Sequence, residues 1–213
     1  CKRPAFHDGY LLAFNRPNVE LVDTAGKGIE RVTENAVIAN GTAYEVDCLI
    51  FATGFEVATA YTRRSECEVY GRGGKSLSDH WADGMSTYHG FLTHDFPNCI
   101  HMGLTQTGVA FNYTYTAVGQ AEHAAYLISE VIRRRATSIE AEPSAEADYQ
   151  KLVRAPGPMR KYQETCTPGY YNVEGKNTGE SFIDNHYPEG AVMFFKMLAA
   201  WREQGELAGL VVK

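Results

Sequence analysis

The sequence predicts an α/β protein, and three observations support that prediction. Two short apolar runs, residues 48–52 and 98–102, are each followed by a turn of small residues. Such runs are typical of strands that are buried on both faces of a sheet. Residues 112–135 carry apolar side chains at spacings of three and four, as an amphipathic helix does. Strands that alternate with helices along the chain indicate an α/β fold.

Composition excludes several classes of function. The chain has 213 residues, of which 44% are hydrophobic and 22% charged, ordinary values for a globular protein. Its 20 Lys and Arg against 26 Asp and Glu give a net charge of −6. A mildly acidic chain without a basic stripe argues against nucleic acid as a partner. No apolar run has the length of a membrane span, so we expect no membrane partner.

The five cysteines indicate free thiols. Their number is odd and no C-x-x-C pair occurs, which favours a reducing compartment such as the cytoplasm. Their spacings do not suit a metal, and we expect no metal site.

The first quarter of the chain is expected to contain two strands and a hairpin. Residues 18–23 alternate with period two, which predicts a short strand. Residues 29–47 predict a hairpin, because Asn40-Gly41 tolerates the positive φ angles of a two-residue turn. The buried run 48–52 then ends at Thr53-Gly54, as a central parallel strand ends at a turn.

The remainder is expected to consist of loops, one strand and three helices. Residues 56–94 have no sustained helical period, which predicts ordered loops with small strands. The second buried strand leads into a glycine-bearing turn at residues 103–108. Helices are predicted at residues 112–135, 145–154 and 191–204, the last ending at Gly205.

Each long helix has a predicted apolar face. In the first, that face holds Val118, Ala121, Ala125, Ile128 and Ile132. In the last, it holds Val192, Phe195, Leu198 and Ala199.

Two strand-end turns are candidates for a nucleotide site. In residues 47–55 an acidic residue and an apolar run precede Ala-Thr-Gly, a turn small enough for the backbone to pass close to a nucleotide. The turn at residues 103–108 lies between a strand and a helix, where backbone N–H groups and the helix dipole favour an anion. It matches neither G-x-G-x-x-G nor a P-loop. The residues alone leave open that both are ordinary turns.

Other chemistry-bearing residues have an ordinary alternative. Arg3 can hold an oxyanion through its planar fork and Lys2 suits a phosphate, but such a pair is commonly a solvated surface pair. Tyr170 lies in a loop that either lines a pocket or only packs. No two of four histidines have helical ligand spacing, so we expect structural or surface roles for His80, His89, His94 and His101.

As an ordered set, these segments resemble the Baeyer–Villiger monooxygenases, over nearly the whole chain. The segments that carry the resemblance are Lys2-Arg3 and residues 14–19, 47–55, 167–172 and 191–202. The resemblance implies the C-terminal part of a flavoprotein with two Rossmann-like dinucleotide-binding domains, one for FAD and one for NADPH. Residues 1–53 would then end the NADPH-binding domain and form the interdomain junction. Residues 54–213 would be the returning part of the FAD-binding domain.

The resemblance also implies roles for particular residues. Arg3 matches the catalytic arginine of the family, and Lys2 matches a neighbour that favours the 2′-phosphate of NADPH. Thr53, Gly54 and Phe55 match the interdomain junction near the flavin. The turn from Gly103 to Asn112 matches the loop that approaches the flavin ring, and Tyr170 matches a loop beside the nicotinamide.

The implied reaction uses FAD, NADPH and O2 to insert one oxygen atom into a ketone, giving an ester or lactone. Both Gly-rich fingerprints of the family and its F-x-G-x-x-x-H-x-x-x-W signature are absent here, and the sequence begins with Cys1. We therefore expect a fragment whose N-terminal half is missing and whose activity belongs to a longer parent chain. The alternatives are an N-hydroxylating or general flavin-containing monooxygenase, or a non-catalytic flavoprotein remnant.

Overall fold

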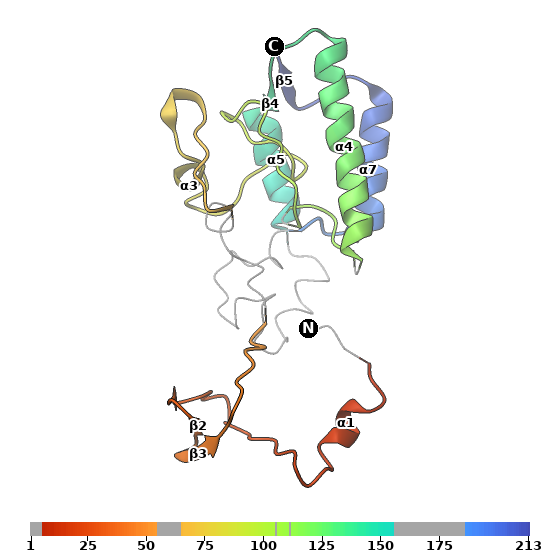
Figure 1. The fold of residues 1–213 in the computed structure, drawn as a ribbon. Coiled ribbons are helices and arrows are strands. Elements are labelled where there is room, and N and C mark those ends of the chain that lie inside the picture. The colour runs from red at the N-terminus through yellow and green to blue at the C-terminus, as the bar shows by residue number, and fades with distance from the viewer. Residues whose placement is uncertain (1–5, 55–64, 105, 111, 156–185) are drawn as a thin grey trace. The chain divides into compact units, whose positions relative to one another are not determined.

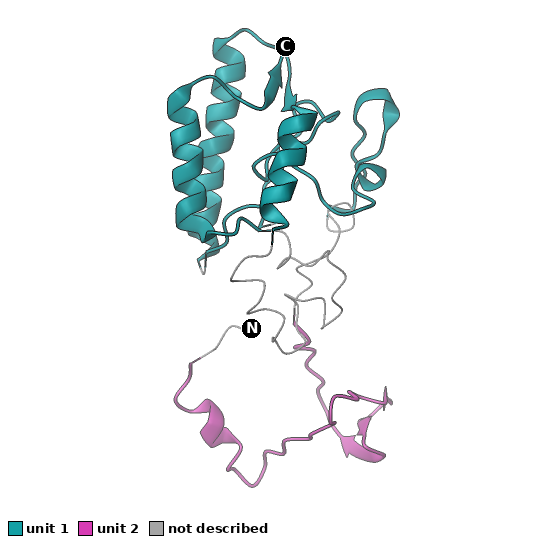
Figure 2. Cartoon of the chain, turned by 180° about the vertical axis from the view of Figure 1, so that it is seen from behind, with its two compact units in different colours: residues 1, 55–213 teal, residues 2–54 magenta. Residues whose placement is uncertain are grey.

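The computed structural model describes residues 6–54, 65–104, 106–110, 112–155 and 186–213 (Figure 1). The chain divides into two compact units after Gly54, residues 2–54 and residues 55–213 (Figure 2). This division lies beside the predicted domain boundary. Which nucleotide domain each unit belongs to remains a prediction.

The first unit contains a short helix and a three-stranded antiparallel sheet. The helix is α1 (Tyr10–Ala13), and the sheet has the order β1 (Arg31–Val32), β2 (Ala36–Ala39), β3 (Thr42–Glu45). Ala39 pairs with Thr42, so the hairpin loop is Asn40-Gly41. Both residues have positive φ, 52° and 74°, as the predicted two-residue turn requires. The hairpin prediction is confirmed.

The two other strands predicted in this unit do not form. Residues 18–23 and 48–52 do not form strands. Ile50 and Phe51 are 81% and 73% exposed instead of buried. A parallel strand needs a neighbouring strand for its hydrogen bonds. Among the described residues no strand lies against this run, so its sequence pattern alone does not produce a strand.

The second unit is built from helices and one small sheet. Its long helices are α4 (Tyr113–Arg133), α5 (Pro143–Val153) and α7 (Gly190–Gln204), at the predicted positions. Figure 1 shows α4 and α7 side by side. Strands β4 (Ile139–Ala141) and β5 (Leu210–Val212) pair antiparallel. A 3₁₀ turn, η1 (Arg72–Gly74), and the short helix α3 (Leu77–His80) precede them within long loops.

The core of this unit joins its helices to the loop after α3. Trp201 and Leu198 of α7 pack there with Leu127 of α4 and Tyr149 of α5. The loop contributes Phe91, which is 1% exposed. Gly205 ends α7 with φ 69°, which confirms the predicted stop. None of the described helices is long and apolar enough to cross a membrane.

The strand predicted at residues 98–102 is absent, because Asn98 turns the chain there. Its φ is +62°, and its side chain bonds across to the start of β4. The amide of Asn98 donates to the Thr137 carbonyl, and its Oδ1 accepts from the N–H of Ile139, both at 3.0 Å. A turn fixed in this way to a neighbouring strand leaves no extended run for a ladder.

The buried faces of the helices differ from the predicted ones. On α4 the predicted apolar face is exposed: Val118, Ile128 and Ile132 are 54%, 50% and 71% exposed, and Ala121 and Ala125 are also exposed. The opposite face is buried and partly polar, and holds Thr116, Gln120, His123, Ala124, Leu127 and Glu130. On α7 the prediction holds in part: Leu198 is fully buried, and Phe195 and Ala199 are partly buried, but Val192 is 58% exposed. Phe194 and Trp201, which were not predicted, are buried as well.

A candidate cofactor-facing loop

The predicted site residues that the structure describes are divided between the two units. Gly103 and Asn112 lie in the second unit, in a loop that leads into α4. Thr53 and Gly54 are exposed at the end of the first unit. Outside the described residues lie Lys2, Arg3, Phe55 and Tyr170. The geometry of the loop at residues 103–112 is therefore what the structure adds to the predicted site.

Buried amide side chains hold this loop in place. Gln106 is fully buried and exchanges hydrogen bonds with Gln150 of α5, at 2.6 and 3.0 Å. The hydroxyl of Tyr149 donates to the Gln106 carbonyl at 2.7 Å. From α4, the Gln120 amide donates to the Gly103 carbonyl and, at 3.1 Å, to the Thr107 hydroxyl. Helices α4 and α5 thus fix the loop through two backbone carbonyls and through the side chains of Gln106 and Thr107.

Glycine is required at two points where the loop meets its neighbours. A Cβ at Gly108 would lie 2.6 Å from the Ala191 Cα and the Phe194 Cβ of α7. A Cβ at Gly90 would lie 2.3 Å from the Thr107 side chain. Gly103 differs, because a Cβ there would meet nothing within 4 Å. The loop is therefore packed closely on its inner side and open at Gly103.

The N-terminus of α4 follows the loop and carries favourable polarity. Asn112 is its N-cap, and the Asn112 side chain accepts a hydrogen bond from the Thr114 N–H at 3.0 Å. No acidic residue lies in the first turn of this 21-residue helix. No carboxylate therefore offsets the N–H groups and the positive end of the helix dipole at this terminus. Such a terminus is suited to bind an anionic or carbonyl oxygen.

Two buried acceptors behind the loop have no hydrogen bond within the described part of the chain. They are Oε1 of Gln120 and Oγ1 of Thr116, which lie one helical turn apart on the buried face of α4. Buried polar atoms are nearly always paired. A helix face that only packed against an apolar core would not need these polar side chains. Their presence on the buried face of α4 sets the surroundings of the loop apart from an ordinary core.

Three buried histidines near the core are neutral over the physiological range. Burial lowers the pKa of His89 and of His123 to about 3, and that of His101 to about 4. Burial also raises the pKa of Tyr149 well above its ordinary value, so this hydroxyl keeps the proton it donates to Gln106. The side chains that donate hydrogen bonds to the loop's carbonyls, Tyr149 and Gln120, are therefore uncharged.

The sequence interpretation missed the residues that hold the loop. Gln106 and Gln120 lie 14 residues apart, and Gln150 follows 30 residues later. No motif spacing links them. One feature of the sequence could have indicated such a role. Gln120 is a polar residue on the same helix face as Ala124 and Leu127, which are buried. His80 and His94, which were expected to be separate, lie together beside Glu146.

Curated relatives match the chain over its whole length. Pentalenolactone D synthase of Streptomyces arenae is 45% identical over 216 residues, which is 100% of this chain and 37% of that protein. Baeyer-Villiger monooxygenase 4 of Dietzia sp. is 41% identical over 99% of this chain and 34% of its own length. The chain thus spans about a third of the length of these relatives. A comparison with models of protein families finds no match.

Solved structures also match the whole chain, and the chain again spans little more than a third of each. The polycyclic ketone monooxygenase of Thermothelomyces thermophila is 30% identical and superposes with a TM-score of 0.86, over 100% of this chain and 35% of that one. Cyclohexanone monooxygenase from Rhodococcus sp. Phi1, solved with NADP+, is 26% identical with a TM-score of 0.79, over 100% and 39%.

These solved structures indicate the class of protein to which the chain is similar. Their fold is that of flavoproteins with two dinucleotide-binding domains, which confirms the predicted fold class. Within that class the chain is similar over its whole length to Baeyer–Villiger monooxygenases, and it spans about a third of the length of these relatives. The resemblance in the sequence is confirmed.

Proposed function

We propose that the chain is the C-terminal part of an FAD- and NADPH-dependent Baeyer–Villiger monooxygenase, which inserts one oxygen atom of O2 into a ketone and forms an ester or lactone. The observation that carries this proposal is the match of the whole chain, at 45% identity, to about a third of a curated relative. The missing partner is then the N-terminal part of the same polypeptide.

The loop at residues 103–112 fits the flavin that the proposal requires. It offers an open backbone at Gly103 and uncompensated N–H groups at the start of α4. Both features suit the polar edge of a flavin ring or its phosphates. Bound FAD would supply the activation of O2 after reduction by NADPH. Gln106 and Gln120 would keep the loop backbone in position, while Asn112 would keep α4 capped.

Residues 2–3 and 53–55 complete the proposed site. Arg3 would stabilise negative charge that develops as oxygen is transferred to the ketone, because its guanidinium is always protonated. Lys2 would bind the 2′-phosphate of NADPH. Thr53, Gly54 and Phe55 would form the junction beside the flavin, with Tyr170 on the nicotinamide side. The thiol pattern supports a cytoplasmic location.

Cyclic ketones are the first substrates to test. The neighbours with solved structures include monooxygenases named for polycyclic ketones, cyclohexanone and steroids. A full-length parent protein should be yellow and should form ester or lactone from such ketones while it consumes NADPH. A yellow protein that oxygenates amines and no ketones would indicate a general flavin-containing monooxygenase. A colourless protein without activity would indicate a remnant.

The role of Arg3 is tested separately. Arg3→Ala should retain flavin but lose ketone oxygenation, and Arg3→Lys should also lose most of it, because lysine lacks the planar fork. Arg31→Ala changes an exposed arginine of β1 and should leave the rate unchanged. Ester formation by Arg3→Ala near the parent rate would contradict the assignment.

A further inference from the structure

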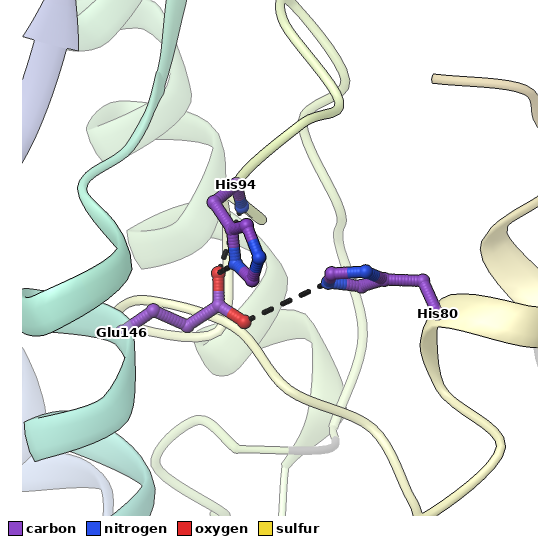
Figure 3. A group of neighbouring side chains, drawn as sticks. All are labelled: His80, His94 and Glu146. Carbon is purple, nitrogen blue, oxygen red and sulfur yellow. Dashed lines mark hydrogen bonds and ion pairs between the residues drawn. The ribbon is translucent and has the colours of Figure 1, made fainter. Parts of the chain in front are cut away.

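Two histidines and a glutamate meet in the second unit, at residues that do not belong to the loop described above. His80 ends α3, His94 lies in the following loop, and Glu146 lies in the first turn of α5 (Figure 3). Their ligand atoms all lie within 4.8 Å of one another. Nδ1 of His94 is 3.0 Å from Oε2 of Glu146, and Nε2 of His80 is 3.9 Å from Oε1.

These separations are close to those of a zinc site. With Zn–N and Zn–O distances of about 2.0–2.2 Å, ligand atoms of a tetrahedral zinc lie roughly 3.3–3.5 Å apart. The distance from His94 to Glu146 is slightly shorter than this, and the distance from His80 is slightly longer. All three ligand atoms lie within 4.8 Å of one another, so the side chains would have to draw together to bind one ion.

The surroundings already orient two of the three ligands. Oε1 of Glu146 accepts from the Ser86 hydroxyl at 2.6 Å, and Oε2 accepts from the His94 N–H at 2.8 Å. Nε2 of His94 lies 4.0 Å from Oδ2 of Asp95. If Nδ1 bound a metal, Nε2–H would face this carboxylate. A carboxylate that orients a metal-bound histidine is a common outer-shell arrangement.

His80 provides an independent observation. Its side chain is only 5% exposed, and Nδ1 has no hydrogen-bond partner among the residues that the structure describes. Nε2 points toward Glu146 but is too distant for a hydrogen bond (Figure 3). A buried imidazole without a hydrogen bond at Nδ1 and with a long contact at Nε2 requires an explanation. A metal ion between Nε2 and the carboxylate would account for the long contact at Nε2.

We propose that His80, His94 and Glu146 form a binding site for a divalent transition-metal ion, most suitably Zn²⁺, which clamps α3 and the loop at His94 to α5. Two imidazoles and one carboxylate suit zinc better than magnesium or calcium, which take oxygen ligands. The His94 side chain is 31% exposed, so water can reach a fourth position.

The experiment is a titration of the full-length protein with Co²⁺ and Zn²⁺ after its thiols are alkylated. Alkylation is needed because Cys48 and Cys67 are exposed and thiolates also bind these metals. We expect one Co²⁺ per chain with visible absorption bands and no thiolate charge-transfer band. Zn²⁺ should displace the Co²⁺ and raise the unfolding temperature, and Mg²⁺ should do neither.

Variants assign the ligands. His80→Gln and His94→Gln should each weaken the binding of Zn²⁺ at least about tenfold and abolish its effect on the unfolding temperature. His7→Gln, at an exposed histidine of the first unit, should change neither. Glu146→Gln tests the third ligand but also disturbs the bonds from Ser86 and His94, so the histidine variants decide. An absence of saturable binding, or binding that both histidine variants retain, would overturn the proposal.

Discussion

The two buried histidines His89 and His123 make stability depend on pH. They are 6% and 1% exposed, and the ring of each lies against Trp201 with centroids 5.5 Å apart. Burial lowers the pKa of both from 6.5 to about 3. In the unfolded chain these rings take up a proton near pH 6.5, whereas the folded protein keeps them neutral until about pH 3.

We predict that the free energy of unfolding falls as the pH is lowered through this window. The unfolded state binds more protons there, so each histidine contributes a slope of up to about 1.4 kcal/mol per pH unit. His123→Gln cannot be protonated and should flatten the pH dependence of the unfolding midpoint. His7→Gln, at an exposed position, should leave it unchanged. Equal slopes for the parent and His123→Gln would refute this account.

Lys2 tests the preference for NADPH over NADH, which rests on the proposed function. A contact between lysine and the 2′-phosphate is charge-assisted and contributes about 1.5–3 kcal/mol. In the full-length protein, Lys2→Ala should therefore raise the KM for NADPH by roughly 10- to 100-fold and change that for NADH little. Steady-state rates with both cofactors check this, with Lys27→Ala as an exposed control. A loss of the same size with NADH would show that Lys2 does not read the phosphate.

At the scale of elements, the loop before α4 contains one closely packed glycine and one open glycine, and the proposed function places FAD beside the open one. Gly108 meets α7 with no room for a Cβ, whereas Gly103 is open. Gly108→Ala should therefore destabilise the fold by about 1–3 kcal/mol through overpacking. Gly103→Ala should leave the unfolding temperature nearly unchanged but weaken FAD binding in the full-length protein. Unfolding curves and flavin content measure the two effects. Destabilisation by Gly103→Ala, or none by Gly108→Ala, would contradict this division.

Elements that depend on neighbouring residues in the sequence could be predicted. Elements that depend on a partner far away in the sequence could not. The hairpin at Asn40-Gly41 follows from two residues whose backbone tolerates positive φ, so the sequence was sufficient. The helices at α4, α5 and α7 follow from periodicity within a few turns. The run at residues 48–52 needed a strand elsewhere in the polypeptide, and its apolar composition could not supply one.

The buried face of α4 shows the same limit. Periodicity correctly located an apolar stripe through Val118 and Ile128, but the described residues bury the opposite face. That face is buried because the neighbouring loop and α7 supply hydrogen-bond partners. Gln120 reaches the Gly103 carbonyl, and Arg202 lies 3.4 Å from His123. A pattern identifies which residues are apolar, while the neighbours determine which residues are covered.

At the scale of the whole molecule, the described residues include large apolar side chains that are exposed. Ile50 and Phe51 of the first unit and the stripe on α4 are largely exposed. Exposed apolar side chains that lie close together within one unit indicate an interaction site or an aggregation risk. The chain spans about a third of the length of its relatives, and we propose that the rest of the parent polypeptide covers these residues.

We therefore predict that the 213-residue chain, expressed alone, self-associates and binds an apolar dye, although its second unit has its own core. Ile128→Glu combined with Ile132→Glu should reduce both effects, because each places a charge on the exposed stripe of α4. In the full-length protein the same pair should lower flavin content or yield, since a buried, unpaired charge is costly. Ser129→Glu adds a charge to an exposed polar position of the same helix and should do neither. A monomeric isolated chain with a sharp cooperative unfolding transition and no dye binding would show that the stripe needs no covering partner.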